Sequence, residues 1–152
     1  MKDMLPETET AADQAVFYET AAVELGKFLT LCNGGAVVVM DMRQLNFWTD
    51  FFVIATVTSS THLSGLDRQI KEFVRDNNLE IIRRSRRPDA SAVLSSDLSG
   101  DEWSVLDLGN IVIHLMSAKT RSFFELERLW SQAPLIYADE SFKKEPYSSK
   151  SS

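Results

Sequence analysis

The sequence predicts a single α/β (α+β) domain in which helices flank a mixed β-sheet of about five strands. Two hydrophobic patterns alternate along the chain. Apolar residues spaced by three and four are typical of amphipathic helices, and short continuous β-branched runs are typical of buried strands. A short Gly-Asn link between two such runs predicts a hairpin. The length of 152 residues suits one domain with one core, so we expect the strands to share one sheet.

The first element is a helix that begins at Ala11 and ends at Asn33–Gly35, because glycine readily takes the left-handed conformation of a C-terminal cap. Its apolar stripe is formed by Ala15, Tyr18, Ala22, Leu25 and Leu29. Residues 1–10 are polar and acidic, and we expect them to be disordered.

Two strands and a second helix follow. Ala36–Asp41 and Phe51–Thr56 are continuous apolar runs, as expected for strands that are covered on both faces. The helix begins in the hydroxyl-rich segment Thr58–Thr61, which offers several N-caps, and it ends at Asn77–Asn78. Its buried stripe is formed by Leu63, Leu66, Ile70, Phe73 and Val74.

A third strand is predicted over Leu79–Ile82, and the polar segment Arg83–Asp101 is predicted to be a surface loop. Trp103–Asp107 and Ile111–Met116 are the last two strands. Gly109-Asn110 between them tolerates the positive φ of a hairpin turn.

The last element is a short helix over Arg121–Trp130, with Phe124, Leu126, Leu129 and Trp130 as its apolar contacts, and Pro134 bars its continuation. The sequence from Asp139 onward is dominated by Lys, Glu, Ser and Pro. The domain is therefore expected to span residues 11–137, with a disordered tail over residues 138–152.

Composition limits the classes of function. The net charge of −6 makes the approach to bare nucleic acid repulsive overall. Cys32 is the single cysteine, and His62 and His114 are the two histidines, so neither an internal disulfide nor a metal site is expected, and no cofactor is predicted. The first residues lack the order of a secretory signal, and no apolar run approaches the ~20 residues that span a bilayer, so a cytoplasmic location is expected.

Three segments match the pattern of a known family: Val37–Arg43, Asp50–His62 and Trp103–Trp130. The third is the most specific, because it combines Trp-x3-Asp-x-Gly, Ile-His and Arg-x5-Glu-x2-Trp. Over residues 15–134 the chain resembles the ribosomal silencing factor S (RsfS) family, also called Iojap-like. Two positions depart from that family: Asn110 stands where an aspartate is usual, and Phe124 where a tyrosine is usual.

The resemblance implies a shape like that of the nucleotidyltransferases without their catalytic carboxylates, and a protein that is not an enzyme. It implies binding to ribosomal protein fourteen of the large ribosomal subunit at the intersubunit face. The bound factor would block joining of the small subunit and so repress translation. An alternative within the same family is a factor that assists large-subunit assembly without silencing. The resemblance also implies homodimers of the free protein.

The partner-binding residues are expected in the last two strands and the last helix. Tryptophan and arginine are enriched in interface hot spots, and an acidic factor that meets a basic ribosomal protein should present carboxylates. The candidates are Trp103, Asp107, His114, Arg121, Phe124, Glu125, Glu127 and Trp130. For His114 and Trp130, a place in the core is favoured over a partner contact. For Trp103, a place in the core and a partner contact are equally well supported.

Two enzymatic hypotheses were weighed against these. Thr58–Ser60 beside His62 resembles a nucleophile with its base, but helix capping explains the same residues. A nucleotidyltransferase needs two carboxylates one residue apart on a strand. Neither Asp41 nor Asp107 has such a neighbour.

A cluster of arginines has no counterpart in the family pattern. One interpretation is a peripheral phosphate contact to ribosomal RNA, and the other is a solvated loop that offsets the acidity of the chain. The residues are Arg83, Arg84, Arg86 and Arg87.

Overall fold

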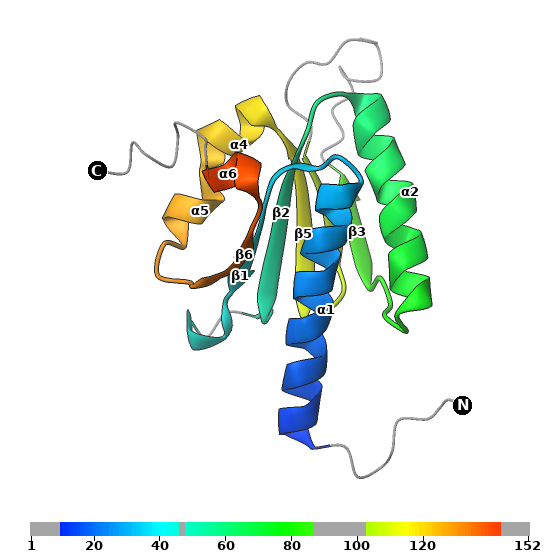
Figure 1. Cartoon of the computed structure of the whole chain (residues 1–152), viewed down its shortest axis with the longest axis vertical. Coiled ribbons are helices and arrows are strands. Elements are labelled where there is room, and N and C mark those ends of the chain that lie inside the picture. The colour runs from blue at the N-terminus through cyan, green and yellow to red at the C-terminus, as the bar shows by residue number, and fades with distance from the viewer. Residues whose placement is uncertain (1–9, 46–47, 87–102, 144–152) are drawn as a thin grey trace.

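The computed structural model describes residues 10–45, 48–86 and 103–143, with the side chains of residues 84–86 and 143 left out (Figure 1). One sheet has the strand order β3-β4-β5-β2-β1-β6. The strands are β1 (Gly35–Asp41), β2 (Phe51–Val57), β3 (Arg83–Arg86), β4 (Trp103–Asp107), β5 (Ile111–Ser117) and β6 (Leu135–Ala138). Only β2 and β5 pair in parallel among these strands, so the predicted mixed sheet flanked by helices is confirmed, with β6 as an addition.

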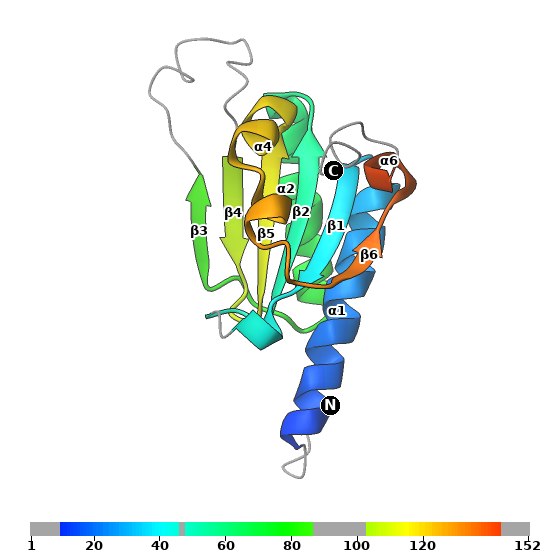
Figure 2. The same ribbon diagram turned by 90° about the vertical axis from the view of Figure 1, so that its left-hand side faces the viewer.

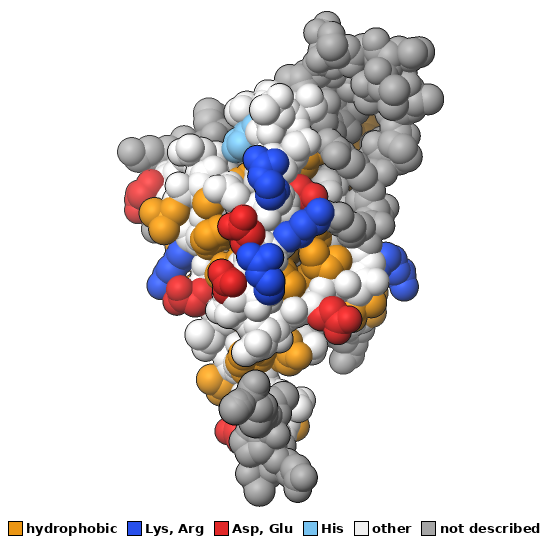
Figure 3. Space-filling view, turned by 90° about the vertical axis from the view of Figure 1, so that its right-hand side faces the viewer, with side chains coloured by type: hydrophobic (Ala, Val, Ile, Leu, Met, Phe, Trp, Pro, Cys, Tyr) orange, Lys and Arg blue, Asp and Glu red, His pale blue; other side chains and the backbone are white. Residues whose placement is uncertain are grey.

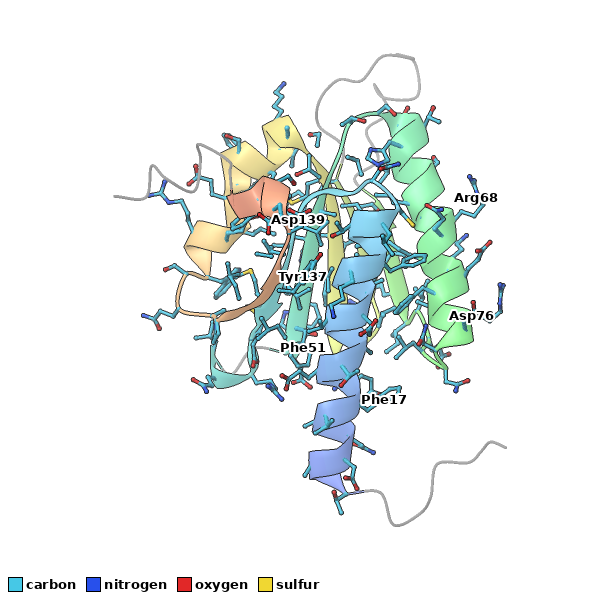
Figure 4. All side chains as sticks on the ribbon, viewed as in Figure 1. Phe17, Phe51, Arg68, Asp76, Tyr137 and Asp139 are labelled. Carbon is cyan, nitrogen blue, oxygen red and sulfur yellow. The ribbon has the colours of Figure 1, made fainter. Side chains whose placement is uncertain are left out.

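The helices α1 (Ala11–Leu31) and α2 (Ser60–Asp76) cover one face of the sheet (Figure 1). Gly26 lets α1 approach the sheet closely, because a side-chain carbon there would lie 2.7 Å from Cγ2 of Val39 and 3.0 Å from Cδ2 of Tyr137. Figure 4 shows Tyr137 beside α1. The N-terminal turns of α1 project beyond the sheet, and Phe17 there is 40% exposed. The main core between helices and sheet contains Leu25, Leu29, Val37, Val39, Val53, Leu63, Leu66, Ile70 and Ile113.

The other face carries shorter helices: α4 (Ala118–Phe124), α5 (Leu126–Leu129) and α6 (Glu140–Lys143) (Figure 2). A 3-10 turn, η1 (Arg43–Leu45), follows β1. The second core lies on this face and contains Val38, Met40, Phe52, Ile54, Val112, Met116, Leu126 and Ala133.

Side-chain caps begin the two long helices. The hydroxyl of Thr10 accepts from the backbone of Asp13 at 3.1 Å, and the carboxylate of Asp13 accepts from the backbone of Thr10. Ser59 caps α2 by accepting from the backbone of His62 at 2.9 Å. The capping role predicted for the Thr58–Thr61 segment is therefore confirmed.

The third strand does not lie where the sequence predicted it. Leu79–Ile82 is not a strand. The backbone N–H of Leu79 donates back to Val74 at the end of α2, and the backbone contact with β4 begins at Ile82, whose N–H donates to Asp107. The strand is β3, Arg83–Arg86, which pairs with β4 in antiparallel register. Four residues of the predicted loop thus belong to the sheet, and residues 87–102 lie outside the described residues.

The predicted C-terminal helix is two helices. Glu125 takes a left-handed conformation, with φ 49° and ψ 55°, and separates α4 from α5. The first begins earlier than predicted, at Ala118, where the hydroxyl of Ser117 accepts from the backbone of Thr120 at 3.1 Å. The break redirects the chain so that Leu126 and Glu127 are buried.

Order extends past the predicted domain end at residue 137. The backbone N–H of Val37 donates to the carboxylate of Asp139 at 3.0 Å, and the N–H of Asp139 donates to the carbonyl of Val37 at 2.9 Å. Ser141 and Phe142 also donate to this buried carboxylate. Residues 138–143 are therefore part of the folded domain, which corrects the predicted tail; residues 1–9 and 144–152 lie outside the described residues.

Candidate partner-binding site

Trp103, at the start of β4, lies in a cluster of aromatic side chains on the face that carries α4 and α5. Its ring centroid is 4.7 Å from that of Phe124, and Phe124 meets Phe123 edge-on at 4.9 Å. The indole N–H of Trp103 donates to Nδ1 of His114 at 3.2 Å. Strand β4, strand β5 and the end of α4 are thus joined by aromatic contacts.

Two members of this cluster, Phe123 and Phe124, are exposed, and so is Leu129 at the end of α5. Phe123 is 78% exposed, Phe124 39% and Leu129 64%. They belong to α4 and α5, which Figure 2 shows on the same face of the sheet. Exposed apolar groups gathered in one region are typical of a protein interface. We call Trp103, Phe123, Phe124 and Leu129 the apolar surface.

Sequence reasoning identified Trp103 and Phe124 as candidates, but missed Phe123 and treated Leu129 as a core contact. The available signal was the adjacent pair Phe123-Phe124. Two successive aromatics on a helix cannot both face the sheet, because neighbouring positions are 100° apart around the axis.

Arg121 and Glu127 are buried and bind each other, rather than facing solvent as expected of partner contacts. Nε of Arg121 donates to the carboxylate of Glu127. Nη1 of Arg121 also donates to Oγ1 of Thr56 at 2.7 Å and to the carbonyl of Gly35 at 3.3 Å. This pair ties α4 and α5 to the ends of β1 and β2, so its role in the structure is to hold the helices that carry the apolar surface.

The other candidates differ in accessibility. Glu125 is half-buried and lies 3.3 Å from Arg128 in an ion pair. Trp130 is half-buried and packs against the second core. Asp107 accepts from the backbone N–H of Gly109 at 2.8 Å, within the turn that follows β4.

His114 lies under the apolar surface, 7% exposed, with its ring centroid 4.7 Å from that of Phe52. Burial lowers the pKa of His114 to about 4, so the imidazole is neutral at neutral pH. Its Nε2 is buried and has no hydrogen-bond partner within residues 10–45, 48–86 and 103–143.

The residues considered for catalysis are held in structural contacts. Nδ1 of His62 accepts from the backbone N–H of Thr58 at 3.0 Å. Arg43 donates to both carboxylate oxygens of Asp41, which holds the pKa of Asp41 below its usual value. Asp41 on β1 and Asp107 on β4 are separated by β2 and β5 in the sheet, so they do not share a site.

The arginine segment forms an edge of the sheet next to β4. Arg83 is exposed and pairs in register with Asp107, and Arg86 pairs in register with Ser104. The backbone of this segment therefore runs beside the strand that begins with Trp103. Arg87 lies outside the described residues.

A cavity of about 260 Å³ opens where β1 and β2 meet α4 and α6. Arg121 is the one charged side chain among its described lining residues, and Glu127 already binds that guanidinium. The lining residues therefore assign no ligand to it. Among the described residues, no three side chains of the metal-binding types lie together, and no helix has both the length and the apolarity to cross a membrane.

The opposite side of the molecule has a different character. Acidic and basic side chains are interspersed over the side on which α2 lies, with hydrophobic ones scattered between them (Figure 3). Exposed charged residues of α2 are Arg68, Lys71, Glu72, Arg75 and Asp76. The face with α4 and α5 is therefore the better candidate for an apolar partner contact.

Comparisons with known proteins agree with the resemblance seen in the sequence. A family model described as "Ribosomal silencing factor during starvation" matches residues 17–152. The chain is similar to ribosomal silencing factor RsfS of Treponema pallidum (strain Nichols), with 37% identity over 102 residues, 66% of this chain and 82% of the relative.

A more distant relative carries a different name. The Mus musculus protein "Mitochondrial assembly of ribosomal large subunit protein 1" is 31% identical over 99 residues, 65% of this chain but 40% of the relative. A crystal structure of a Bacillus halodurans protein superposes with a TM-score of 0.55 and 22% identity, covering 79% of this chain and 96% of that one. The latter likeness shows a common fold.

Proposed function

Because this chain belongs to the ribosomal silencing factor family, we propose that it binds the large ribosomal subunit and represses translation. The contact lies at the intersubunit face, on ribosomal protein fourteen of that subunit. The bound protein then blocks joining of the small subunit by steric occlusion. The protein acts in the cytoplasm, without a catalytic step or a cofactor.

The observation that carries this proposal is the apolar surface of Trp103, Phe123, Phe124 and Leu129. Phe123 is 78% exposed, so a partner that covers the ring would remove a large apolar area from water. Tryptophan and other aromatic side chains at the centre of an interface supply most of its binding free energy. The net charge of −6 favours a basic partner such as a ribosomal protein over bare RNA.

The expected contact residues fall into two groups. Trp103, Phe124, Glu125 and Trp130 are at least partly exposed, so we propose direct contact for them, together with Phe123 and Leu129. His114, Arg121 and Glu127 are buried, are bonded within the domain and support the surface from inside. Asp107 is half-buried and bonds the turn at the other end of β4, so its place as a contact residue remains a proposal apart from this surface.

We propose a peripheral RNA contact for the arginine segment Arg83–Arg87. In support, β3 lies at the edge of the sheet beside the strand that carries Trp103, and Arg83 is exposed. If the protein docks on the ribosomal protein through the apolar surface, this edge would therefore lie near the ribosomal RNA around that protein. Phosphate contacts there would add affinity without setting the partner.

Assembly of the large subunit is the second candidate function. It is favoured by the name of the Mus musculus relative, which refers to assembly of the mitochondrial large subunit. Both functions use the same contact surface. They differ in whether the protein prefers precursor or mature subunits, so parallel binding to both separates them.

The test is sedimentation of the purified protein with isolated large subunits, and separately with small subunits, followed by a subunit-joining assay. We expect co-pelleting with large subunits alone and inhibition of joining. Phe123→Ser should weaken both, whereas Lys71→Ser on the exposed face of α2 should change neither. Binding to neither subunit, or equally to both, would refute the proposal.

A further inference from the structure

We propose that His114 is a positioning residue that fixes the indole of Trp103 in the orientation the partner recognises. The inference rests on the function proposed above and assigns a role to a residue that is itself buried. It is carried by the hydrogen bond between the two side chains, by the ring contacts on both sides of them, and by the unpaired nitrogen of the imidazole.

The strand register brings the two residues together. His114 on β5 pairs directly with Val105 of β4, and Trp103 lies two residues before Val105, on the same face of the sheet. At this diagonal position the indole reaches over the imidazole. Its Nε1 lies 3.2 Å from Nδ1 of His114, and the ring centroids are 6.1 Å apart.

The hydrogen bond defines the tautomer of the imidazole. An indole nitrogen only donates, so Nδ1 of His114 must carry the lone pair and Nε2 the proton. The lowered pKa of about 4 agrees with this neutral form. His114 therefore acts as a fixed acceptor at neutral pH.

Packing alone does not account for a histidine here, because Nε2 has no hydrogen-bond partner among the described residues. A buried N–H without an acceptor is destabilising, and a leucine or phenylalanine at this position would avoid that cost. What an apolar side chain cannot supply is the acceptor for Trp103. The acceptor nitrogen is thus the property that distinguishes His114 from an ordinary core residue.

Neighbouring rings restrict the remaining freedom. Phe52 meets the imidazole edge-on at 4.7 Å, and Phe124 packs against the indole at 4.7 Å. Because the single N–H of the indole is bonded inside the domain, Trp103 offers its apolar ring to the partner. An indole already held in this orientation loses less side-chain entropy on binding.

The test compares three variants at position 114 by affinity for purified large subunits. His114→Asn keeps an acceptor, Oδ1, at the place of Nδ1, whereas His114→Leu and His114→Gln do not keep one there. We expect binding about tenfold weaker for His114→Leu and His114→Gln, and nearly unchanged for His114→Asn. The polar glutamine variant serves if the leucine variant does not fold.

A spectroscopic readout separates positioning from stability. The indole N–H resonance of Trp103, assigned by its loss in Trp103→Phe, should shift in His114→Leu and remain near its wild-type position in His114→Asn. In the Trp103→Phe background, His114→Leu should weaken binding no further, because the residue it positions is already gone.

The outcomes distinguish the two proposals. If the wild-type protein does not bind large subunits, the proposed function fails, and the inference with it. If the wild type binds but His114→Leu and His114→Gln bind equally well, the inference alone is overturned. Equal weakening by leucine and asparagine would also overturn it, since that result would assign the effect to packing.

Discussion

At the scale of single residues, Asn110 links the hairpin between β4 and β5 to the segment that precedes β2. The side-chain amide of Asn110 donates to the carboxylate of Asp50 at 2.9 Å. The backbone carbonyl of Asn110 accepts from the backbone N–H groups of Asp50 and Phe51. The aspartate usual at this position in the family would bring a second carboxylate against Asp50. Asparagine replaces that repulsion with a hydrogen bond.

Asn110→Asp should therefore destabilise the fold at neutral pH by about 1–2 kcal/mol, through the lost donor and the facing carboxylates. Denaturant unfolding at pH 7 and pH 3.5 measures this. The difference from wild type should shrink at the lower pH, where carboxylates protonate. Asn110→Ser, which adds no charge, is the control and should show no such pH dependence.

The buried His114 should make stability depend on pH. Its folded pKa of about 4 lies below the usual ~6.5, so the unfolded chain binds the proton more tightly. Stability should fall as pH decreases from about 6.5 to about 4, by up to about 3 kcal/mol. Unfolding of wild type and His114→Asn over this range tests it, and parallel curves for the two proteins would contradict it.

Arg83 offers a test of the RNA contact. Removal of one phosphate contact reduces the slope of log affinity against log salt by about one unit. We expect this change for Arg83→Ala on large subunits, whereas Arg68→Ala on α2 should leave the slope unchanged. Equal slopes for Arg83→Ala and wild type would favour the interpretation that the arginines only offset acidity.

At the scale of elements, the break between α4 and α5 determines how the apolar surface is presented. The left-handed Glu125 lets Glu127 meet Arg121 inside the domain, while Phe123 and Leu129 face outward on either side of the break. A continuous helix over the same residues would not bring Arg121 and Glu127 together inside the domain with Phe123 and Leu129 outside. The ion pair thus supports the geometry of the surface without touching a partner.

Glu127→Ala should destabilise the protein by about 3–5 kcal/mol, because it leaves the buried guanidinium of Arg121 without its carboxylate. Thermal and denaturant unfolding measure this loss. Glu125→Ala is the comparison, since its ion pair with Arg128 is partly exposed and contributes about 1 kcal/mol or less. Similar decreases in the free energy of unfolding for both variants would show that the buried ion pair contributes no more to stability than the exposed one.

At the scale of the whole molecule, the C-terminal segment completes the sheet. Strand β6 pairs with β1, and Tyr137 on β6 lies beside α1, where its hydroxyl is 2.9 Å from that of Thr30 (Figure 4). Beyond β6, Asp139 binds the backbone of Val37. One segment of the C-terminal chain therefore joins the edge of the sheet to the first helix.

Truncation after Pro134 should expose the edge of β1 and remove the contacts of Asp139. We expect a lower midpoint of unfolding and concentration-dependent association, because an unpaired strand edge is a template for pairing. Unfolding and light scattering measure the two effects. Truncation after Lys143, which retains β6 and α6, is the control and should behave as the full chain.

Elements with strong local signals are predictable from the sequence alone. Helical spacing in α1 and α2, the buried runs of β1, β2 and β5, and the Gly109 turn are each encoded within a few neighbouring residues. The family resemblance and two members of the apolar surface, Trp103 and Phe124, also followed from sequence patterns.

The edge strands and the buried ion pair become evident only in the folded domain. β3 consists of polar residues, which form a strand because they pair with β4. β6 forms a strand because it pairs with β1. Likewise, Arg121 and Glu127 are internal because one left-handed residue turns them together. The physical reason is the same in each case: the stabilising contact comes from residues distant in the chain or from a backbone conformation that local composition does not specify.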